Sequence, residues 1–366
     1  MDNRELPFYV VRVTTAEGPQ LKKVIIDEEG QKITEDIPGP LSAVLELTNR
    51  CNLECVCCLN NSGPSVDTST ELKLSEIYDI IDQLSAMGTT GITLSGGEPF
   101  LRKDVFDIIE YARQKMFVSF STNGLLLDKK TVKNLCKEGV AGLIVDIHSC
   151  DAALNDTITK RKGSFKKAVQ GVKNCLDAGV ACSINTTVTK MNMGTIEDTI
   201  NFALELGVDM VINKFIPVGR GDLNREKLVL SLDEYSDVVT LLYEKKKALE
   251  TTMDIQVCHI PYESLLLDQG IFTGCDAGLM LCKITPQGEV YTCPFLPISV
   301  GNIREQSFAD IWRTSPSPVL KALRTKKGLK GKCSTCEHTE KCGGCRANAY
   351  AYTGDFLESD PYCIIQ

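Results

Sequence analysis

Between about residues 41 and 225, apolar residues follow two alternating patterns. Short apolar runs of strand length are followed by segments in which apolar residues recur every three to four positions, the period of a helix. The strand-like runs are AVLEL (43–47), GITLS (91–95), FVSFS (117–121), AGLIVDIH (141–148), ACSINTTVT (181–189) and DMVINKFIPV (209–218). The helix-like segments cover 75–87, 104–115, 129–139, 164–179 and 195–207. Six strands that alternate with helices predict parallel βαβ units.

The segments on either side differ from this alternation. Residues 1–40 hold the apolar runs FYVVRV and KKVIID and a DEEG turn, which predict a small β element. Residues 231–269 are expected to form a bridging helix and linker, with Ser231 and Glu234 in capping-box positions, as Thr195 and Asp198 are earlier. Short strands, turns and cysteines then predict a separate domain over 270–366, so we expect the alternating unit to occupy 41–230.

Polar motifs follow the ends of the predicted strands. Four cysteines at 51–58 follow the first strand, SGGEP (95–99) ends the second, STNG (121–124) the third and IHS (147–149) the fourth. Parallel α/β sheets place their chemistry at the carboxyl ends of the strands. These motifs are therefore expected to meet in one site, although polar loops follow strands in many proteins.

Composition changes the picture chiefly through seventeen cysteines. The start of the chain lacks the pattern of a secretory signal, and no apolar run is long enough to span a membrane. We therefore expect a cytoplasmic protein with reduced thiols, in which clustered cysteines are metal ligands. The net charge of −8 indicates no basic face for nucleic acid or a membrane. The isolated cysteines are expected in the core: Cys136, Cys150, Cys175, Cys182 and Cys258.

Cys51, Cys55 and Cys58 have the spacing C-x3-C-x2-C. Three thiolates on one loop can hold three irons of a [4Fe–4S] cube and leave the fourth iron open for a small molecule. Cys57 adjoins Cys58, so we expect it to line the site without binding iron. A ferredoxin-like cluster loop or a zinc loop is the alternative.

The cysteine motif with SGGEP after the second strand resembles the radical S-adenosylmethionine superfamily over residues 41–225. The resemblance implies a partial (β/α)6, TIM-like barrel with S-adenosylmethionine bound to the open iron. It also implies reductive cleavage of that cofactor to a 5′-deoxyadenosyl radical, which abstracts hydrogen from a substrate. The electron for this cleavage implies a reductant such as flavodoxin or ferredoxin. The cofactor-binding residues it implies are Gly96, Gly97, Glu98, Ser121, Asn123, Asn185 and Arg220.

The C-terminal cysteines include two C-x2-C pairs, at 333–336 and 342–345. The spacing favours iron–sulfur clusters and leaves structural zinc open. The array resembles the SPASM extension, which carries auxiliary clusters. Two auxiliary [4Fe–4S] clusters follow from the resemblance: one on Cys275, Cys282, Cys293 and Cys345, and one on Cys333, Cys336, Cys342 and Cys363.

The substrate is the least determined feature. The motifs resemble mycofactocin-type peptide maturases and relatives that modify side chains of haem-type tetrapyrroles. We expect a ribosomally made peptide, with tetrapyrrole modification as the alternative and a multi-cluster electron-transfer protein as the non-enzymatic one. Asp146 and His148, on one face at the end of the fourth strand, are the candidate acid–base residues.

Overall fold

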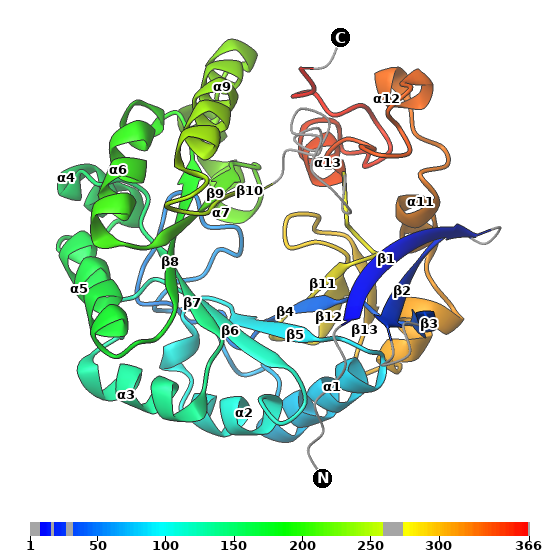
Figure 1. The fold of residues 1–366 in the computed structure, drawn as a ribbon, viewed down its shortest axis with the longest axis horizontal. Helices are drawn as coiled ribbons and strands as arrows, with labels where there is room; N and C mark the ends of the chain where they lie inside the picture. The colour runs from blue at the N-terminus through cyan, green and yellow to red at the C-terminus, as the bar shows by residue number, and fades with distance from the viewer. Residues whose placement is uncertain (1–7, 16–17, 27–31, 259–273, 365–366) are drawn as a thin grey trace.

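The computed structural model describes residues 8–15, 18–26, 32–258 and 274–364, which form two sheets with helices around the larger one (Figure 1). The predicted turn at 27–30 and residues 259–269 of the predicted linker lie outside the described residues. The larger sheet holds ten strands in the order β10-β9-β8-β7-β6-β5-β4-β11-β12-β13.

All six predicted strands of the alternating unit are present. They are β4 (Ser42–Glu46), β5 (Gly91–Ser95), β6 (Phe117–Thr122), β7 (Gly142–Asp146), β8 (Cys182–Val188) and β9 (Asp209–Lys214). Neighbours pair in parallel and in chain order, as successive βαβ units require. The α/β partial barrel is therefore confirmed. A further strand, β10 (Ile255–Cys258), extends the sheet beyond β9.

Helices form an outer arc around these strands (Figure 1). The predicted ones are α1 (Leu74–Ala86), α2 (Val105–Ala112), α3 (Lys129–Glu138), α5 (Ser164–Asp177), α6 (Ile196–Leu206) and α9 (Leu232–Leu249). Short segments that the periodicity did not predict are α4 (Ala152–Thr159), α7 (Gly219–Leu223), α8 (Arg225–Leu228), η1 (Pro99–Leu101) and η2 (Met193–Thr195).

Of the two predicted capping boxes, one is confirmed. Ser231 and Glu234 exchange side-chain and backbone hydrogen bonds at the start of α9. The Thr195 box is wrong: the Thr195 hydroxyl lies 3.0 Å from that of Ser149 and donates to the Asn192 carbonyl. The side chain is thus used to hold the loop after β7, so it does not cap α6.

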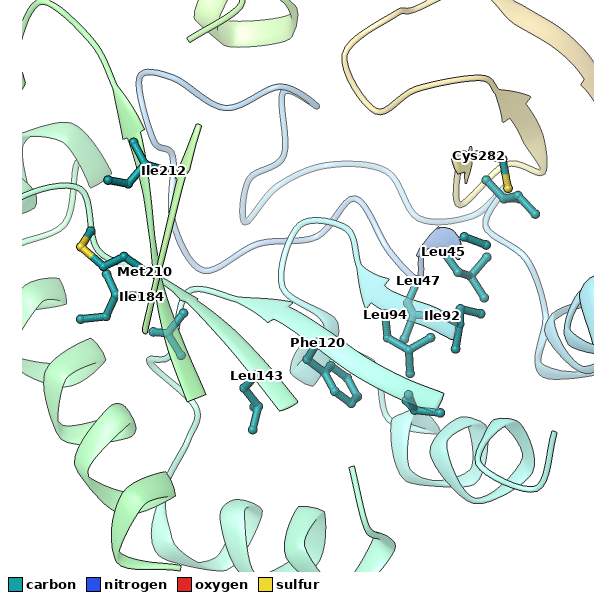
Figure 2. Close-up of a cluster of buried hydrophobic side chains, with 14 of the residues drawn as sticks. Leu45, Leu47, Ile92, Leu94, Phe120, Leu143, Ile184, Met210, Ile212 and Cys282 are labelled. Carbon is teal, nitrogen blue, oxygen red and sulfur yellow. The ribbon is translucent and has the colours of Figure 1, made fainter. Parts of the chain in front are cut away.

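Side chains of the barrel strands alternate between two environments. Leu45, Ile92, Phe120, Leu143 and Ile184 point toward the helices and form the core shown in Figure 2. Their strand neighbours point to the opposite face, which is polar at the carboxyl ends of the strands. One face of the sheet therefore stabilises the fold, and the other is left for a site.

The C-terminal residues continue the barrel sheet. β11 (Leu281–Ile284) pairs in parallel with β4, and β12 (Glu289–Tyr291) and β13 (Ser299–Asn302) follow in antiparallel order. The remaining segments are η3 (Asp310–Thr314), α11 (Pro318–Thr325), α12 (Gly331–Thr335) and α13 (Arg346–Thr353). The sheet therefore gains strands from beyond the predicted limit of residue 230 at both of its edges.

The small β element near the N-terminus is present as a separate antiparallel sheet. It consists of β1 (Phe8–Thr15), β2 (Gly18–Ile26) and β3 (Lys32–Ile37). Among the isolated cysteines, Cys175 is buried as predicted, but Cys136 is exposed, because it lies on the outer face of α3.

Candidate active site and metal centres

A cavity of about 250 Å³ lies at the carboxyl ends of the barrel strands. It brings together ten of the residues predicted to form the site, from five strands and the loops that follow them: Cys51, Cys55, Cys58, Gly96, Gly97, Ser121, Asn123, Asp146, His148 and Asn185. Leu59, Phe215, Ile216, Pro294 and Phe295 add an apolar wall. The cavity therefore combines thiols, polar groups and an apolar surface from distant parts of the chain.

The three predicted cluster ligands lie on one loop after β4. The Cys51 thiol accepts hydrogen bonds from the Leu53 N–H at 3.4 Å and from the Asn123 side chain at 3.7 Å. Across the described residues, no three His, Cys, Asp or Glu side chains converge closely enough for a single metal ion. Cys51, Cys55 and Cys58 all line the cavity, and three thiols are the donor set of a [4Fe–4S] cube with three protein ligands.

The electrostatics of these thiols point the same way. Burial raises the pKa of Cys51 and of Cys57 to about 12, and burial followed by the neighbouring thiols raises the pKa of Cys55. Such thiols stay protonated near pH 7 unless a cation stabilises the thiolate. Iron would supply that charge.

Two glycines hold the loop after β5 against the cysteine loop. The Gly97 N–H donates to the Thr48 carbonyl at 2.7 Å, and the Glu98 N–H donates to the Arg50 carbonyl at 2.9 Å. A Cβ on Gly97 would lie 2.2 Å from the Arg50 carbonyl oxygen. Gly96 has a φ of +132°, and a Cβ there would lie 2.4 Å from the Thr48 oxygen. Only glycine permits this approach, which leaves the backbone of both residues at the cavity.

Two predicted cofactor-binding side chains lie behind the cavity. Glu98 is fully buried and accepts hydrogen bonds from the Thr122 hydroxyl and from the N–H groups of Asn123 and Phe100. Arg220 donates to the carbonyls of Cys55 and Ser62, at 3.2 and 2.6 Å. In this structure both side chains position the loops that form the cavity. Their direct contact with a cofactor stays a prediction.

Asp146 and His148 line the cavity wall as predicted from their spacing. Burial raises the pKa of Asp146 to about 6, and its carboxylate accepts a hydrogen bond from Asn185, which in turn accepts one from Asn213. Burial lowers the pKa of His148 to about 4. Its Nδ1 accepts from the Thr187 N–H, so the proton lies on Nε2, 3.9 Å from the Cys57 thiol. His148 is neutral at pH 7 and both of its ring nitrogens have partners, so it is a poor proton donor. Asp146, with a pKa of about 6, is the better candidate for proton transfer near pH 7.

We expect Asp146→Asn to stabilise the protein in a pH-dependent way. The Asp146 carboxyl has an ordinary pKa of 3.8 in the unfolded chain and a pKa of about 6 in the folded protein. Its ionisation therefore lowers the free energy of unfolding of the wild-type protein as the pH rises through this range. The amide avoids that cost and keeps the oxygen that accepts from Asn185. The gain should be on the order of 1–3 kcal/mol at pH 7.5 and close to zero at pH 4. Anaerobic thermal unfolding at both pH values measures it, with exposed Asp237→Asn as control; equal gains at both pH values would contradict the account.

Four C-terminal cysteines surround a second cavity, of about 280 Å³. Cys333, Cys336, Cys342 and Cys363 all line it, as predicted for one auxiliary cluster. The buried Arg346 guanidinium donates to the Cys333 thiol at 3.5 Å, and the Gly344 N–H donates to that of Cys342 at 3.4 Å. Donors to sulfur stabilise thiolates. Arg346 was not predicted; its place directly after the last C-x2-C pair was the available signal.

Three other cysteines gather between this second cavity and the first. Cys275, Cys293 and Cys345 belong to one small apolar cluster, and the Cys345 thiol interacts electrostatically with the other two. Pro294 and Phe295, directly after Cys293, line the active-site cavity. A cluster held by these thiols would therefore border the substrate.

The structure places the fourth ligand predicted for this set, Cys282, in the core and apart from the other three cysteines. In the parallel pairing of β11 with β4, Cys282 lies beside Ala43 and Lys283 beside Val44. Val44 lines the active-site cavity, whereas Ala43 and Cys282 belong to the core on the helix-facing side (Figure 2). Burial alone raises the pKa of Cys282, without a contribution from another thiol. The strand alternation therefore turns this side chain away from the other three cysteines.

We expect Cys282→Ala to leave the iron content of the reconstituted protein unchanged. Cys293→Ala should lower it by up to about four irons per chain, because it removes a ligand of a [4Fe–4S] cube. Iron and sulfide determination on both variants measures the difference. Equal losses in the two variants would show that Cys282 binds iron.

Lys214 is a buried cation that the sequence analysis did not single out. Its Nζ lies 3.7 Å from the centre of the Tyr362 ring and 4.6 Å from that of Tyr235. Burial lowers its pKa to about 8, opposed by the charges of Asp360 and Cys345. The Asp360 carboxylate accepts from the Cys345 N–H at 2.9 Å. These partners come from distant segments, so no local motif indicates this positive charge beside the thiols.

Comparison with known proteins identifies the families that the chain resembles. The radical SAM superfamily pattern matches residues 45–203, and the iron–sulfur cluster-binding SPASM domain matches 275–337. The AdoMet-dependent heme synthase of Methanosarcina barkeri is 36% identical over 89% of this chain and 97% of its own length. The Fe-coproporphyrin III synthase of the same organism is 29% identical over 88% and 87%. The mycofactocin maturase MftC of Mycobacterium ulcerans is 29% identical over 91% and 90%.

Solved structures share the fold. Streptococcus suis SuiB bound to S-adenosylmethionine superposes with a TM-score of 0.73 at 20% identity, over 90% of this chain and 78% of SuiB. That similarity covers both the barrel and the C-terminal region. Among the described residues, no helix is long and apolar enough to cross a membrane.

Proposed function

Because the chain belongs to the radical SAM superfamily and carries a SPASM domain, we propose that it modifies the side chains of an iron tetrapyrrole on the route to heme. The observation that carries the proposal is the 36% identity to a heme synthase along almost the whole of both chains. A peptide was the expectation from sequence. The mycofactocin maturases are less similar, at 29% identity for the one described above.

The cofactors follow from the family and from the thiols present. We propose S-adenosylmethionine and one [4Fe–4S] cluster on Cys51, Cys55 and Cys58, with two auxiliary clusters on the C-terminal cysteines. When bound, the first cluster and S-adenosylmethionine supply a carbon radical that removes hydrogen from an unactivated C–H bond. Gly96, Gly97, Ser121, Asn123 and Asn185 border the space where the cofactor would lie.

The cavity suits a large, partly apolar substrate. Phe215, Ile216, Pro294 and Phe295 offer an apolar wall to the face of a porphyrin ring. Lys283, beside Asn60 at 3.4 Å and Glu46 at 3.5 Å, is a cation that could meet a propionate. A substrate carboxylate would have to compete with Glu46 for it.

The reaction class follows from the difference between Fe-coproporphyrin III and heme. Two propionates of the first are vinyl groups in the second. Loss of a hydrogen atom from the carbon next to the ring, followed by loss of CO2, forms each vinyl group and releases one electron. An acceptor must take that electron. The position of Cys293 directly before Pro294 and Phe295, which line the cavity, supports an acceptor cluster on these thiols.

Anaerobic incubation with Fe-coproporphyrin III, S-adenosylmethionine and a reductant tests the proposal. We expect heme, CO2 and 5′-deoxyadenosine, identified by liquid chromatography and mass spectrometry. A mycofactocin-type precursor peptide serves as the competing substrate. Modified peptide with no change in the porphyrin would overturn the tetrapyrrole proposal and restore the peptide expectation.

A further inference from the structure

A third cavity, of about 470 Å³, lies between the small N-terminal sheet and the C-terminal segments η3 and α11 (Figure 1). It shares no lining residue with the active-site cavity or with the cavity of the C-terminal cysteines. Its volume falls in the range of sites that hold small molecules. The walls of this third cavity therefore belong to parts of the chain that the proposed reaction does not use.

Three cations line the third cavity: Arg313, Lys321 and Arg324. Within the described part of the chain, none of them forms an ion pair with an acidic side chain. Asp36 is the only acid among the described residues of the lining, and its exposed carboxylate lies 3.3 Å from Lys22 Nζ. The cavity thus holds positive charge that neighbouring side chains do not neutralise.

Arg324 is fixed in the wall of this cavity. Its Nε donates to the Gly278 carbonyl at 2.7 Å, and its guanidinium carbon lies 5.0 Å from the centre of the Trp312 ring. Its two terminal nitrogens form no hydrogen bond among the described residues. Burial, followed by the charge of Arg313, lowers the pKa of Arg324 to about 10. Because a buried cation beside a like charge is unfavourable, an anion between the two guanidiniums would stabilise both.

The cavity also offers apolar contacts. Its apolar side chains come from the sheet, from the segment before β11 and from η3: Leu21, Ile37, Leu279 and Trp312. A bare inorganic ion would leave this surface in contact with water. A ligand that joins an apolar group to its anionic group would cover the apolar surface and neutralise the cations.

We propose that the third cavity binds a small organic dianion, with either a phosphate monoester or a pair of carboxylates as its charged group. Guanidinium groups bind the oxygens of phosphates and carboxylates through paired hydrogen bonds. Two arginines and a lysine match the double negative charge, and the apolar side chains would contact the rest of the ligand. The site lies apart from the active-site cavity, so the proposal holds whatever the substrate is.

Isothermal titration calorimetry on the reconstituted protein tests the proposal at pH 7.5, where phenyl phosphate and phthalate are both dianions. We expect at least one of these two probes to bind, with one molecule per chain, and the tighter probe identifies the charged group. Inorganic phosphate should bind at least about tenfold more weakly than the tighter probe, because it lacks the apolar ring. Binding by neither probe, or equal binding of inorganic phosphate, would overturn the proposal.

The test variant combines Arg313→Gln with Lys321→Gln, because both side chains are exposed and the contacts of Arg324 stay intact. It should weaken binding by at least about tenfold. The matched control, Lys162→Gln with Lys166→Gln, removes two exposed cations from another basic part of the surface and should keep wild-type affinity. Unchanged affinity in the test variant, or equal weakening in both variants, would contradict the assignment to this cavity. No tetrapyrrole is used, so failure here leaves the proposed function untouched.

Discussion

Replacing Cys51, Cys55 and Cys58 together with alanine should abolish formation of 5′-deoxyadenosine and lower the iron content from about 12 to about 8 per chain. The three thiols share one loop at the cavity. The fourth cysteine of that loop is Cys57, whose thiol lies 3.9 Å from His148 Nε2. The C-terminal cysteine sites are built from other segments, so their iron should remain.

The control for this experiment is Cys57→Ala. It removes a thiol of the same loop that we do not assign to iron, and it should keep about 12 irons. Iron, sulfide and zinc are measured after anaerobic reconstitution. Unchanged iron in the triple variant would contradict the assignment of the first cluster. About 4 irons with zinc in the wild type would make the C-terminal sites structural.

Gly97→Ala is the single substitution with the largest expected effect. The new Cβ would meet the Arg50 carbonyl oxygen at 2.2 Å and its carbon at 2.6 Å. These are backbone atoms of the residue before Cys51, so relief requires the cysteine loop to move. We expect a loss of stability on the order of 3 kcal/mol, with loss of about four irons per chain.

Gly194→Ala provides the comparison, because no atom lies within 4 Å of the added Cβ. It should keep wild-type iron content and unfolding temperature. Both variants are measured by iron determination and anaerobic thermal unfolding. A Gly97→Ala protein with full iron content would show that the two loops are less tightly fixed than their contacts indicate.

Much of the fold was predictable because the barrel strands and helices carry strong local periodicity. The bounds of β5 agree with the apolar run GITLS residue for residue. α4 was missed because its eight residues hold only two large apolar side chains, Leu154 and Ile158, which are too few to display a period. The pairing of β11 with β4 was also missed, since it joins residues more than two hundred positions apart.

The candidate site was also predictable only in part, where its residues belong to local motifs. The three cysteines after β4 and the glycines after β5 form local motifs, and the structure brings them together at one cavity. Cys282 was assigned from a resemblance in spacing, and strand alternation turns it into the core. Spacing alone does not reveal the side of a strand on which a residue lies. Lys214 and Arg346 act through tertiary contacts and carried no local motif of their own.

The central claim is that this cavity removes hydrogen from a tetrapyrrole side chain. Deuterium transfer tests it most directly, with Fe-coproporphyrin III labelled on the propionate carbons next to the ring. We predict 5′-deoxyadenosine that carries one deuterium, formed together with vinyl-bearing product, and none with the Cys51, Cys55 and Cys58 variant. Unlabelled 5′-deoxyadenosine with intact porphyrin, alongside deuterium transfer from a labelled peptide, would contradict the account.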